Sequence, residues 1–227
     1  MAQVIELVDV RVRLGQREVL RGVSASLAER RVGVIGANGS GKSTLARLFN
    51  GLAVPTSGRV TVLGEDTRRQ AARIRRRVGF LFTDPDAQIV MPTVAEDVAF
   101  SLRRKKLPGE EVRHRVETML ARYGLAGHAD HPAHQLSGGQ KQLLALCSVL
   151  VLEPEILVMD EPTTLLDLRH SRQVAEALRA LPMQVIVVTH DLPLLEGFDR
   201  VLVLDEGQVV ADGTPESAIG HYRKLMA

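Results

Sequence analysis

Hydrophobic positions along the chain follow two different patterns. Frequent branched residues over 4–14 and 19–27, with Gly15 between them, predict two strands joined by a turn. Short, continuous apolar runs come later, over 32–35, 156–159, 185–189 and 201–204. Runs of this kind are typical of parallel strands that are buried on both faces of a sheet. The sequence therefore predicts an N-terminal β-layer followed by an α/β core.

Helical segments are expected over 43–51, 110–123 and 141–152. The first follows a predicted strand and a glycine-rich loop, whereas the other two lie between core strands. We therefore expect one domain spanning residues 1–227, with a helical subdomain inserted at about 88–152.

The amino-acid composition limits which class of protein this chain can belong to. Hydrophobic residues make up 45% and charged residues 25% of the 227 residues, as in an ordinary globular domain. The longest apolar runs are far shorter than the roughly 20 residues needed to cross a bilayer, so a partner would have to supply any membrane span. No secretory signal is visible, which favours the cytoplasm. A single cysteine, Cys147, excludes an intramolecular disulfide and a cysteine-rich metal site.

The net charge of +2 conceals two basic clusters. They comprise Arg68, Arg69, Arg73, Arg75, Arg76 and Arg77, and then Arg103, Arg104, Lys105 and Lys106. Such runs usually form solvated faces. Nucleic-acid grooves normally interleave basic and stacking aromatic residues, and aromatics are only 3% of this chain, so we expect no nucleic-acid partner. A patch that faces an anionic membrane is a further alternative, which we rank between a solvated face and a nucleic-acid site.

A phosphate-binding loop is expected between the strand at 32–35 and the helix at 43–51. The segment comprises Gly36, Ala37, Asn38, Gly39, Ser40, Gly41, Lys42, Ser43 and Thr44, and it fits the pattern G-x-x-x-x-G-K-[ST]. Its glycines let backbone N–H groups surround an anion, Lys42 pairs with the terminal phosphates, and Ser43 can bind Mg²⁺. A glycine-rich turn with a chance lysine is the alternative, and the flanking strand and helix argue against it. ATP and Mg²⁺ are the expected cofactors.

A second chemical site follows the apolar run at 156–159. Asp160 ends this run and can hold the water shell of the metal, while Glu161 can act as general base toward the attacking water. An apolar run followed by two acids is weak evidence by itself. After a phosphate-binding loop it indicates nucleotide hydrolysis.

Residues 136–140 read Leu-Ser-Gly-Gly-Gln and precede the helix expected over 141–152. The group formed by Ser137, Gly138, Gly139 and Gln140 predicts another anion cup at a helix start. Because the chain already has one cradle for its own nucleotide, two cups imply two chains. The alternative is a helix cap with a purely structural purpose.

In this order the motifs resemble those of the ATP-binding cassette (ABC) ATPase family. The resemblance implies a P-loop NTPase (RecA-like) core with an N-terminal antiparallel β-layer and an inserted helical subdomain. It also implies a head-to-tail dimer in which the segment at 136–140 caps the γ-phosphate of ATP held by the opposite subunit. Residues 162–167 are similar to the D-loop, with Asp167 at the dimer seam, and His190 matches the switch histidine.

Two positions depart from the family pattern. Thr83 stands where the family usually has a glutamine, and either Thr83 or Gln88 is a candidate to contact Mg²⁺ in its place. Near Leu14, where many relatives carry an aromatic that stacks on adenine, Leu14 or Arg13 offers only apolar or cation–π contact. We therefore expect loose selectivity for the base.

Three histidines, His128, His131 and His134, form a further candidate metal site. Pro132 would break any helix that placed all three on one face, so we expect a solvated loop instead.

The segments 84–88 and 93–100 look like those of the ATPase subunits of energy-coupling factor transporters, which import vitamins and transition-metal ions. This resemblance implies a transmembrane coupling subunit, a separate membrane substrate-binding subunit, and a peripheral place on the cytoplasmic face of the membrane. Short single-domain versions resemble the ATPases of biotin importers and of some cobalt or nickel importers, and biotin is favoured. Another ABC transporter, including an exporter, and a soluble ABC ATPase are the alternatives.

Overall fold

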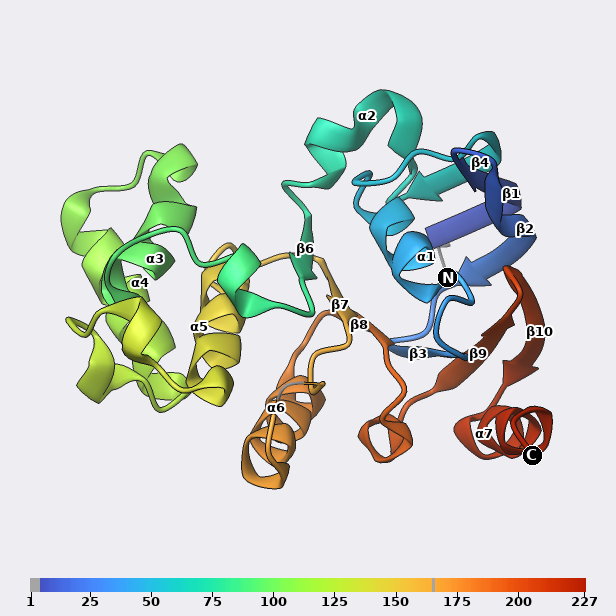
Figure 1. Ribbon diagram of the computed structural model, residues 1–227. Helices are drawn as coiled ribbons and strands as arrows, with labels where there is room; N and C mark the ends of the chain where they lie inside the picture. The colour runs from blue at the N-terminus through green and yellow to red at the C-terminus, as the bar shows by residue number, and fades with distance from the viewer. Residues whose placement is uncertain (1–4, 165) are drawn as a thin grey trace.

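A six-stranded sheet forms the centre of the larger lobe in the computed structural model, which describes residues 5–164 and 166–227 (Figure 1). Its order is β10-β9-β3-β8-β7-β6, and all pairs are parallel except β9 with β10. The strands are β3 (Arg31–Ile35), β6 (Val78–Leu81), β7 (Ile156–Asp160), β8 (Gln184–Val188), β9 (Arg200–Asp205) and β10 (Gln208–Gly213). The carboxyl ends of β3, β7 and β8 therefore lie side by side at one edge.

A second, antiparallel sheet contains β1 (Ile5–Leu14), β2 (Arg17–Leu27), β4 (Ser57–Val62) and β5 (Glu65–Asp66). Its buried side chains share one hydrophobic cluster with side chains of β3, β7 and β8. Helix α1 (Lys42–Phe49) contributes Leu45, Leu48 and Phe49 to the same cluster, and each of these residues is at most 1% exposed. This apolar packing fixes the start of α1, and with it the loop that follows β3.

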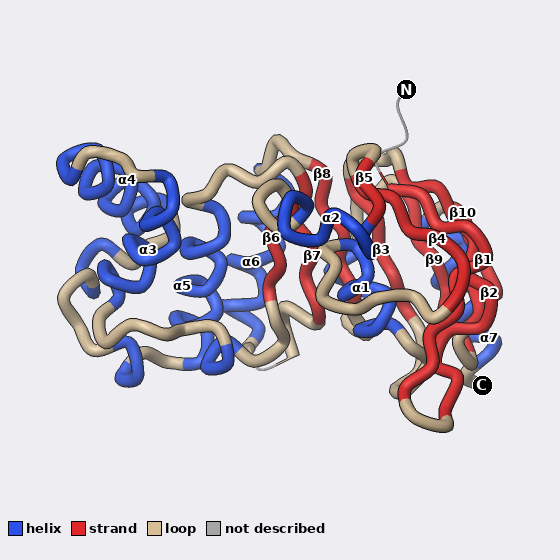
Figure 2. The backbone as a smooth tube through the Cα atoms, turned by 90° about the horizontal axis from the view of Figure 1, so that it is seen from above, coloured by secondary structure: helices blue, strands red, loops and turns tan. Residues whose placement is uncertain are grey.

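The smaller lobe is helical and lies between β6 and β7 in sequence. It contains α3 (Val94–Leu102), α4 (Gly109–Arg122) and α5 (Gly138–Leu150), and α5 packs against both α3 and β6. Capping boxes begin two of these helices, at Thr93 for α3 and Ser137 for α5. The remaining helices, α2 (Thr67–Ile74), α6 (Leu168–Ala180) and α7 (Pro215–Leu225), belong to the larger lobe (Figure 2).

The expected α/β class, the antiparallel layer and the buried core strands are confirmed. The strands expected over 32–35, 156–159 and 201–204 agree with β3, β7 and β9 to within one residue at each end. The strand expected over 4–14 agrees with β1 from residue 5 onward, and residue 4 lies outside the described residues. Cys147 is buried, and its pKa is raised to about 12 by that burial, so the thiol behaves as a small core side chain.

None of the helices in the described residues is both long enough and apolar enough to traverse a bilayer.

Arg31 ties the start of β3 to the end of α6. The side chain is only 8% exposed, and its guanidinium donates to the main-chain oxygens of Met183 at 2.8 Å and Leu178 at 3.0 Å, and also to that of Leu181. Burial lowers the pKa of Arg31, and these carbonyl oxygens compensate for the lost hydration.

Replacing Arg31 should destabilise the larger lobe. Arg31→Met keeps most of the side-chain volume but leaves buried carbonyl groups without a donor, which costs about 1–3 kcal/mol of unfolding free energy. Urea unfolding measures this change. Arg172→Met, at an exposed position on α6, is the matched control and should stay close to the unsubstituted protein. Equal stability of the two variants would contradict the structural role of Arg31.

Candidate nucleotide-binding site

The loop between β3 and α1 is shaped by its glycines. Gly39 and Gly41 have φ angles of 80° and 104°, which side chains other than glycine rarely adopt. A Cβ atom on Gly36 would lie 2.0 Å from the main-chain oxygen of Leu204. The loop therefore requires glycine at these positions, and its N–H groups precede the N-terminus of α1, as anion binding demands.

Two polar side chains in this loop fit a phosphate ligand. Lys42 is 6% exposed, and its Nζ donates to the main-chain oxygens of Gly36 at 2.8 Å and Ala37 at 3.0 Å. Burial lowers the pKa of Lys42, while the nearby carboxylates of Glu161 and Asp160 oppose that shift. Ser40 has a buried hydroxyl with no hydrogen-bond partner in the structure. Because a buried polar atom without a partner is costly, Ser40 is suited to a ligand oxygen.

Ser43 and Asp160 meet where α1 faces the end of β7. The Ser43 hydroxyl donates to Asp160 Oδ1 at 2.9 Å, and Asp160 is only 2% exposed. Burial raises the pKa of Asp160, since the carboxylate is poorly hydrated there. A hydroxyl and a carboxylate are the oxygen donors that Mg²⁺ prefers, so the two residues present fit this ion.

Glu161 and His190 form a second pair at the same edge. His190 Nδ1 lies 2.8 Å from Glu161 Oε2, and the main-chain N–H of His190 donates to the same oxygen at 3.2 Å. The Glu161 side chain is 13% exposed and that of His190 is 56% exposed. Glu161 also has a φ of 52°, a strained conformation that is commonly found at functional sites.

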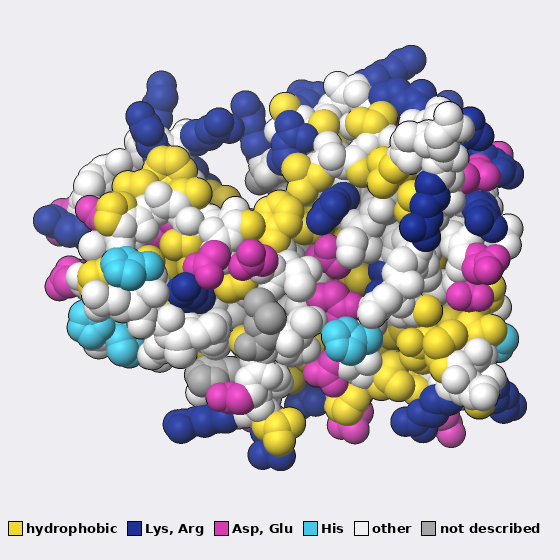
Figure 3. Space-filling view, in the orientation of Figure 1, with side chains coloured by type: hydrophobic (Ala, Val, Ile, Leu, Met, Phe, Trp, Pro, Cys, Tyr) yellow, Lys and Arg dark blue, Asp and Glu magenta, His cyan; other side chains and the backbone are white. Residues whose placement is uncertain are grey.

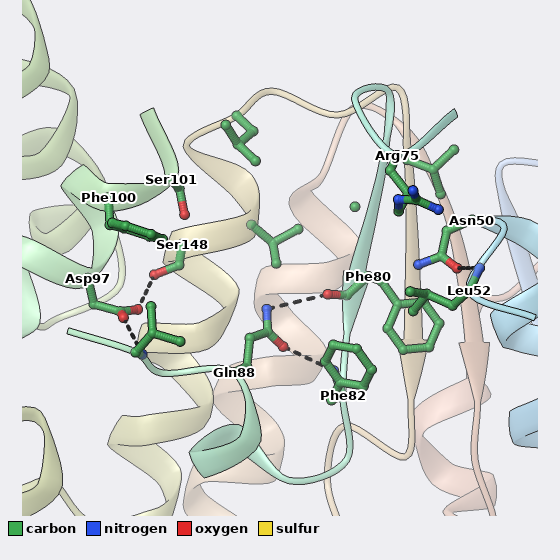
Figure 4. Close-up of a pocket in the computed structure, with 15 residues that line it drawn as sticks. Asn50, Leu52, Arg75, Phe80, Phe82, Gln88, Asp97, Phe100, Ser101 and Ser148 are labelled. Atoms are coloured by element: carbon green, nitrogen blue, oxygen red, sulfur yellow. Dashed lines mark hydrogen bonds between the residues drawn. The ribbon is translucent and has the colours of Figure 1, made fainter. Parts of the chain in front are cut away.

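Thr83 also reaches this edge, whereas Gln88 does not. The Thr83 hydroxyl donates to the main-chain oxygen of Asp160 at 2.9 Å. The Gln88 side chain instead accepts from the N–H of Phe82 at 3.2 Å and donates to the carbonyl of Phe80 at 3.4 Å (Figure 4). Of the two residues expected to replace the family glutamine, Thr83 is thus the one that lies next to the acidic pair.

Gln88 lies in a groove between the two lobes. This cavity of about 370 Å³ is lined mainly by apolar side chains, among them Phe80, Phe82 and Phe100 (Figure 4). In its lining, Asp97 is 3% exposed and accepts from the Ser148 hydroxyl at 2.8 Å, which connects α3 to α5. The sequence alone did not reveal this groove, because its wall residues are far apart in the chain.

The cup expected at 137–140 is in the helical lobe, across the molecule from α1 (Figures 1 and 2). The N–H of Ser137 donates to Gln140 Oε1 at 2.9 Å, so the Gln140 side chain closes the helix start. Gly138 and Gly139 form the first turn of α5. No hydrogen bond recorded for the described residues joins this cup to the loop at 36–44. A single chain therefore carries both cups without bringing them together.

The histidines near this cup do not form a three-ligand site. His128 Nδ1 lies 2.9 Å from His131 Nδ1, and His128 Nε2 lies 3.1 Å from Gln140 Nε2. Over 5–164 and 166–227, the structure contains no cluster of three or more His, Cys, Asp or Glu side chains that could hold a metal.

A hollow of about 230 Å³ next to the glycine-rich loop is lined by Arg17, Val19, Ser40 and neighbouring residues. Arg17 donates to the main-chain oxygen of Gly39 at 3.3 Å. Leu14 is 60% exposed at the end of β1. Arg17 belongs to no motif, so its contact with the loop could not be predicted from the sequence.

The D-loop segment is described only in part. Leu165 lies outside the described residues, while Asp167 directly precedes α6. Thr163 donates to Asp191 Oδ2 at 3.1 Å, which connects the segment after β7 to the residue after His190.

Residues 20–164 match the sequence pattern of the ABC transporter family. The chain belongs to the ABC ATPase family. This ABC ATPase binds and hydrolyses ATP as a subunit of a transporter, and the resemblance seen in its motifs is confirmed.

Three known proteins place this ABC ATPase among its relatives. The biotin transport ATP-binding protein BioM of Rhizobium etli is 47% identical over 98% of this chain and 99% of its own length. The structure of cbiO1 from Clostridium perfringens, described as part of the ABC transporter complex cbiONQ, has a TM-score of 0.85 and 32% identity, covering 99% of this chain and 93% of that one. The dimeric cassette MJ0796 bound to ADP and Pi has a TM-score of 0.81 and 29% identity, covering 93% and 98%. Other relatives carry only the general name of ABC transporter ATP-binding proteins.

Removing the Thr83 hydroxyl should impair hydrolysis by displacing Asp160. Thr83→Val keeps the shape of the side chain but loses the bond to the Asp160 carbonyl, so we expect a roughly 2- to 10-fold higher Mg²⁺ concentration for half-maximal ATPase activity. Titration of ATPase rate against Mg²⁺ measures this shift. Thr83→Ser retains the hydroxyl and should restore the unsubstituted Mg²⁺ dependence. An unchanged Mg²⁺ dependence in Thr83→Val would exclude the positioning role.

Proposed function

We propose that this ABC ATPase powers an importer of the energy-coupling factor type, bound peripherally at the cytoplasmic face of the membrane. The observation that carries the proposal is the apolar groove between the lobes, which offers a transmembrane coupling subunit a surface beside the nucleotide site. A vitamin or transition-metal ion is the proposed substrate of the complete importer. Biotin is favoured, because the Rhizobium etli relative that matches nearly the whole chain is named as a biotin transport protein.

The nucleotide site is proposed to be completed by a second ATPase subunit, either another copy or a related chain. Lys42 and Ser43 of one subunit hold the phosphates, and Ser137, Gly138 and Gly139 of the other cap them in a head-to-tail sandwich. The separation of loop and cup within one chain supports this arrangement, as does the dimeric state of the similar cassette MJ0796. When bound, Mg²⁺ would neutralise charge on the terminal phosphates, held by the oxygens of Ser43 and Asp160.

Hydrolysis is assigned to residues at the ends of β7 and β8. The Glu161 carboxylate accepts a proton from the attacking water as general base. His190 Nδ1 is bonded to Glu161 Oε2, so it orients the carboxylate, and the exposed ring, when protonated on both nitrogens, would also donate from Nε2 to the γ-phosphate. Lys42 stabilises the charge that develops on the departing phosphate. Loss of the γ-phosphate removes the anion shared by both subunits, and the sandwich reopens.

Glu161→Gln should separate ATP binding from hydrolysis. The amide cannot accept the proton, so we expect turnover to fall by at least about 100-fold while ATP is retained. Size-exclusion chromatography with ATP and Mg²⁺ should then show a dimer. Lys42→Ala, which removes a phosphate contact, is the contrasting variant and should remain monomeric. A monomeric, ATP-loaded Glu161→Gln protein would overturn the sandwich.

Purification from native membranes tests the importer itself. The tagged chain should retain two small membrane proteins, with biotin or a metal ion bound to one of them. Phe100→Glu places a charge in the groove and should lower the recovery of these proteins at least about tenfold. Leu225→Glu is the matched control, because the two side chains are 43% and 41% exposed and Leu225 lies on α7. Recovery with an exporter's membrane domain would overturn the importer assignment and leave the ATPase assignment intact.

A further inference from the structure

Two basic clusters lie on different lobes of the molecule. The α2 cluster consists of Arg68, Arg69, Arg73, Arg75 and Arg76, and the α3 cluster of Arg103, Arg104, Lys105 and Lys106; all nine side chains are exposed. The first lies on α2 and directly after it, and the second directly follows α3. Neither cluster takes part in the nucleotide site described above.

The two clusters flank the apolar groove. Arg75 lines one wall of the groove cavity, and Phe100 lines the other. Phe100 also lines an adjoining hollow together with Arg103 and Lys106. Figure 3 shows Lys and Arg side chains along the upper edge of both lobes, on either side of a hollow in the surface. The positive charge therefore surrounds the groove and faces the same side of the molecule.

These charges are largely uncompensated. Over the residues that the structure describes, the α2 cluster forms no ion pair, and in the α3 cluster only Lys105 has one, with Glu153 at 3.7 Å. Among the acids close to the α2 cluster, Glu65 and Glu155 pair with Arg77, and Asp66 caps the start of α2 through backbone N–H groups.

Elsewhere this chain does pair its arginines. Arg200 forms ion pairs with Asp212 at 2.6 Å and with Glu29 at 3.0 Å, and these partners raise its pKa. Like charges held close together repel one another, so an unpaired cluster is unfavourable unless an anionic partner is present.

The partner must carry anionic charge over a broad surface rather than along a narrow track. The clusters are spread over two lobes, and the phenylalanine rings between them line an apolar groove instead of alternating with basic residues along one continuous track, which is the arrangement that single-stranded nucleic acids require. A membrane with acidic lipids presents negative charge over an extended plane. The proposed function places this face toward a membrane subunit, and the inference about lipids rests on that placement.

We propose that the α2 and α3 clusters bind anionic phospholipid headgroups on both sides of the groove. The lipid surface thereby holds the ATPase with its groove directed at the membrane. Each Lys or Arg close to such a surface strengthens partitioning about fivefold, so the loss of three charges should weaken it roughly 100-fold.

Vesicle sedimentation with the purified full-length chain tests the proposal. The probes are vesicles of phosphatidylcholine alone and vesicles that also contain about one-third phosphatidylglycerol, both free of membrane protein. We expect binding only to the anionic vesicles, weakening as salt is raised. Arg69→Gln, Arg73→Gln and Arg76→Gln together should reduce this binding roughly 100-fold, and the same result is expected for Arg103→Gln, Arg104→Gln and Lys106→Gln.

The matched control removes three exposed arginines from α6: Arg169→Gln, Arg172→Gln and Arg179→Gln. It changes the net charge equally and should leave binding within about threefold of the unsubstituted chain. Basal ATPase rate and melting temperature verify that each triple variant is folded. Equal weakening by the control would show a net-charge effect and overturn the proposal, as would absence of binding to anionic vesicles.

A short single-stranded RNA serves as the competing polyanion. Binding to RNA that is tighter than binding to anionic vesicles, and lost in the same variants, would assign the clusters to nucleic acid and overturn the lipid proposal. Because the vesicles contain no transporter subunit, these outcomes are independent of the membrane co-purification. Vesicle binding together with failure to recover membrane subunits would reject the importer and keep the lipid surface.

Discussion

The parallel register of β3, β7 and β8 is the constraint on which the nucleotide site depends. Arg31 of β3 pairs with Val185 of β8, and β7 is paired with β8 from Ile156 to Asp160. Because all three strands run in the same direction, the glycine-rich loop, the acidic pair and His190 emerge at a single edge. A slip of one residue in any of these strands would turn its side chains to the opposite face.

Burial gives this edge its chemical character. Asp160 is nearly inaccessible and its pKa is raised, whereas that of Lys42 is lowered by the same loss of hydration. Each charged form is therefore poorly solvated by the protein alone, and a nucleotide with its cation would supply the missing counter-charges. The buried Ser40 hydroxyl, which has no hydrogen-bond partner, likewise indicates that a ligand completes the site. The cradle is thus suited to a ligand that carries both an anionic and a cationic group.

Segments could be predicted from the sequence where a local pattern of residues identifies them. The core strands were predictable because they are continuously apolar, and the glycine-rich loop because only glycine satisfies its backbone. Strand β4 begins with Ser57, Gly58 and Arg59, all exposed, so it lacks the pattern that identified the others. Helix α3 was not expected either, although Thr93 gives it a capping box. Contacts between distant segments, such as Arg17 with the glycine-rich loop, leave no local pattern at all.

The replacement of the family glutamine by Thr83 shows how geometry resolves what the sequence left open. The Thr83 side chain is too short to extend far beyond β6, yet it is bonded to the main chain of Asp160 itself. Gln88 holds Phe80 and Phe82 of the preceding segment from the groove side. Under the proposed function, a coupling segment in the groove would contact Gln88, and displacement of its side chain would free the segment that ends at Thr83. The Asp160 segment and the groove are thus separated by one short stretch of backbone, which Thr83 holds on one side and Gln88 on the other.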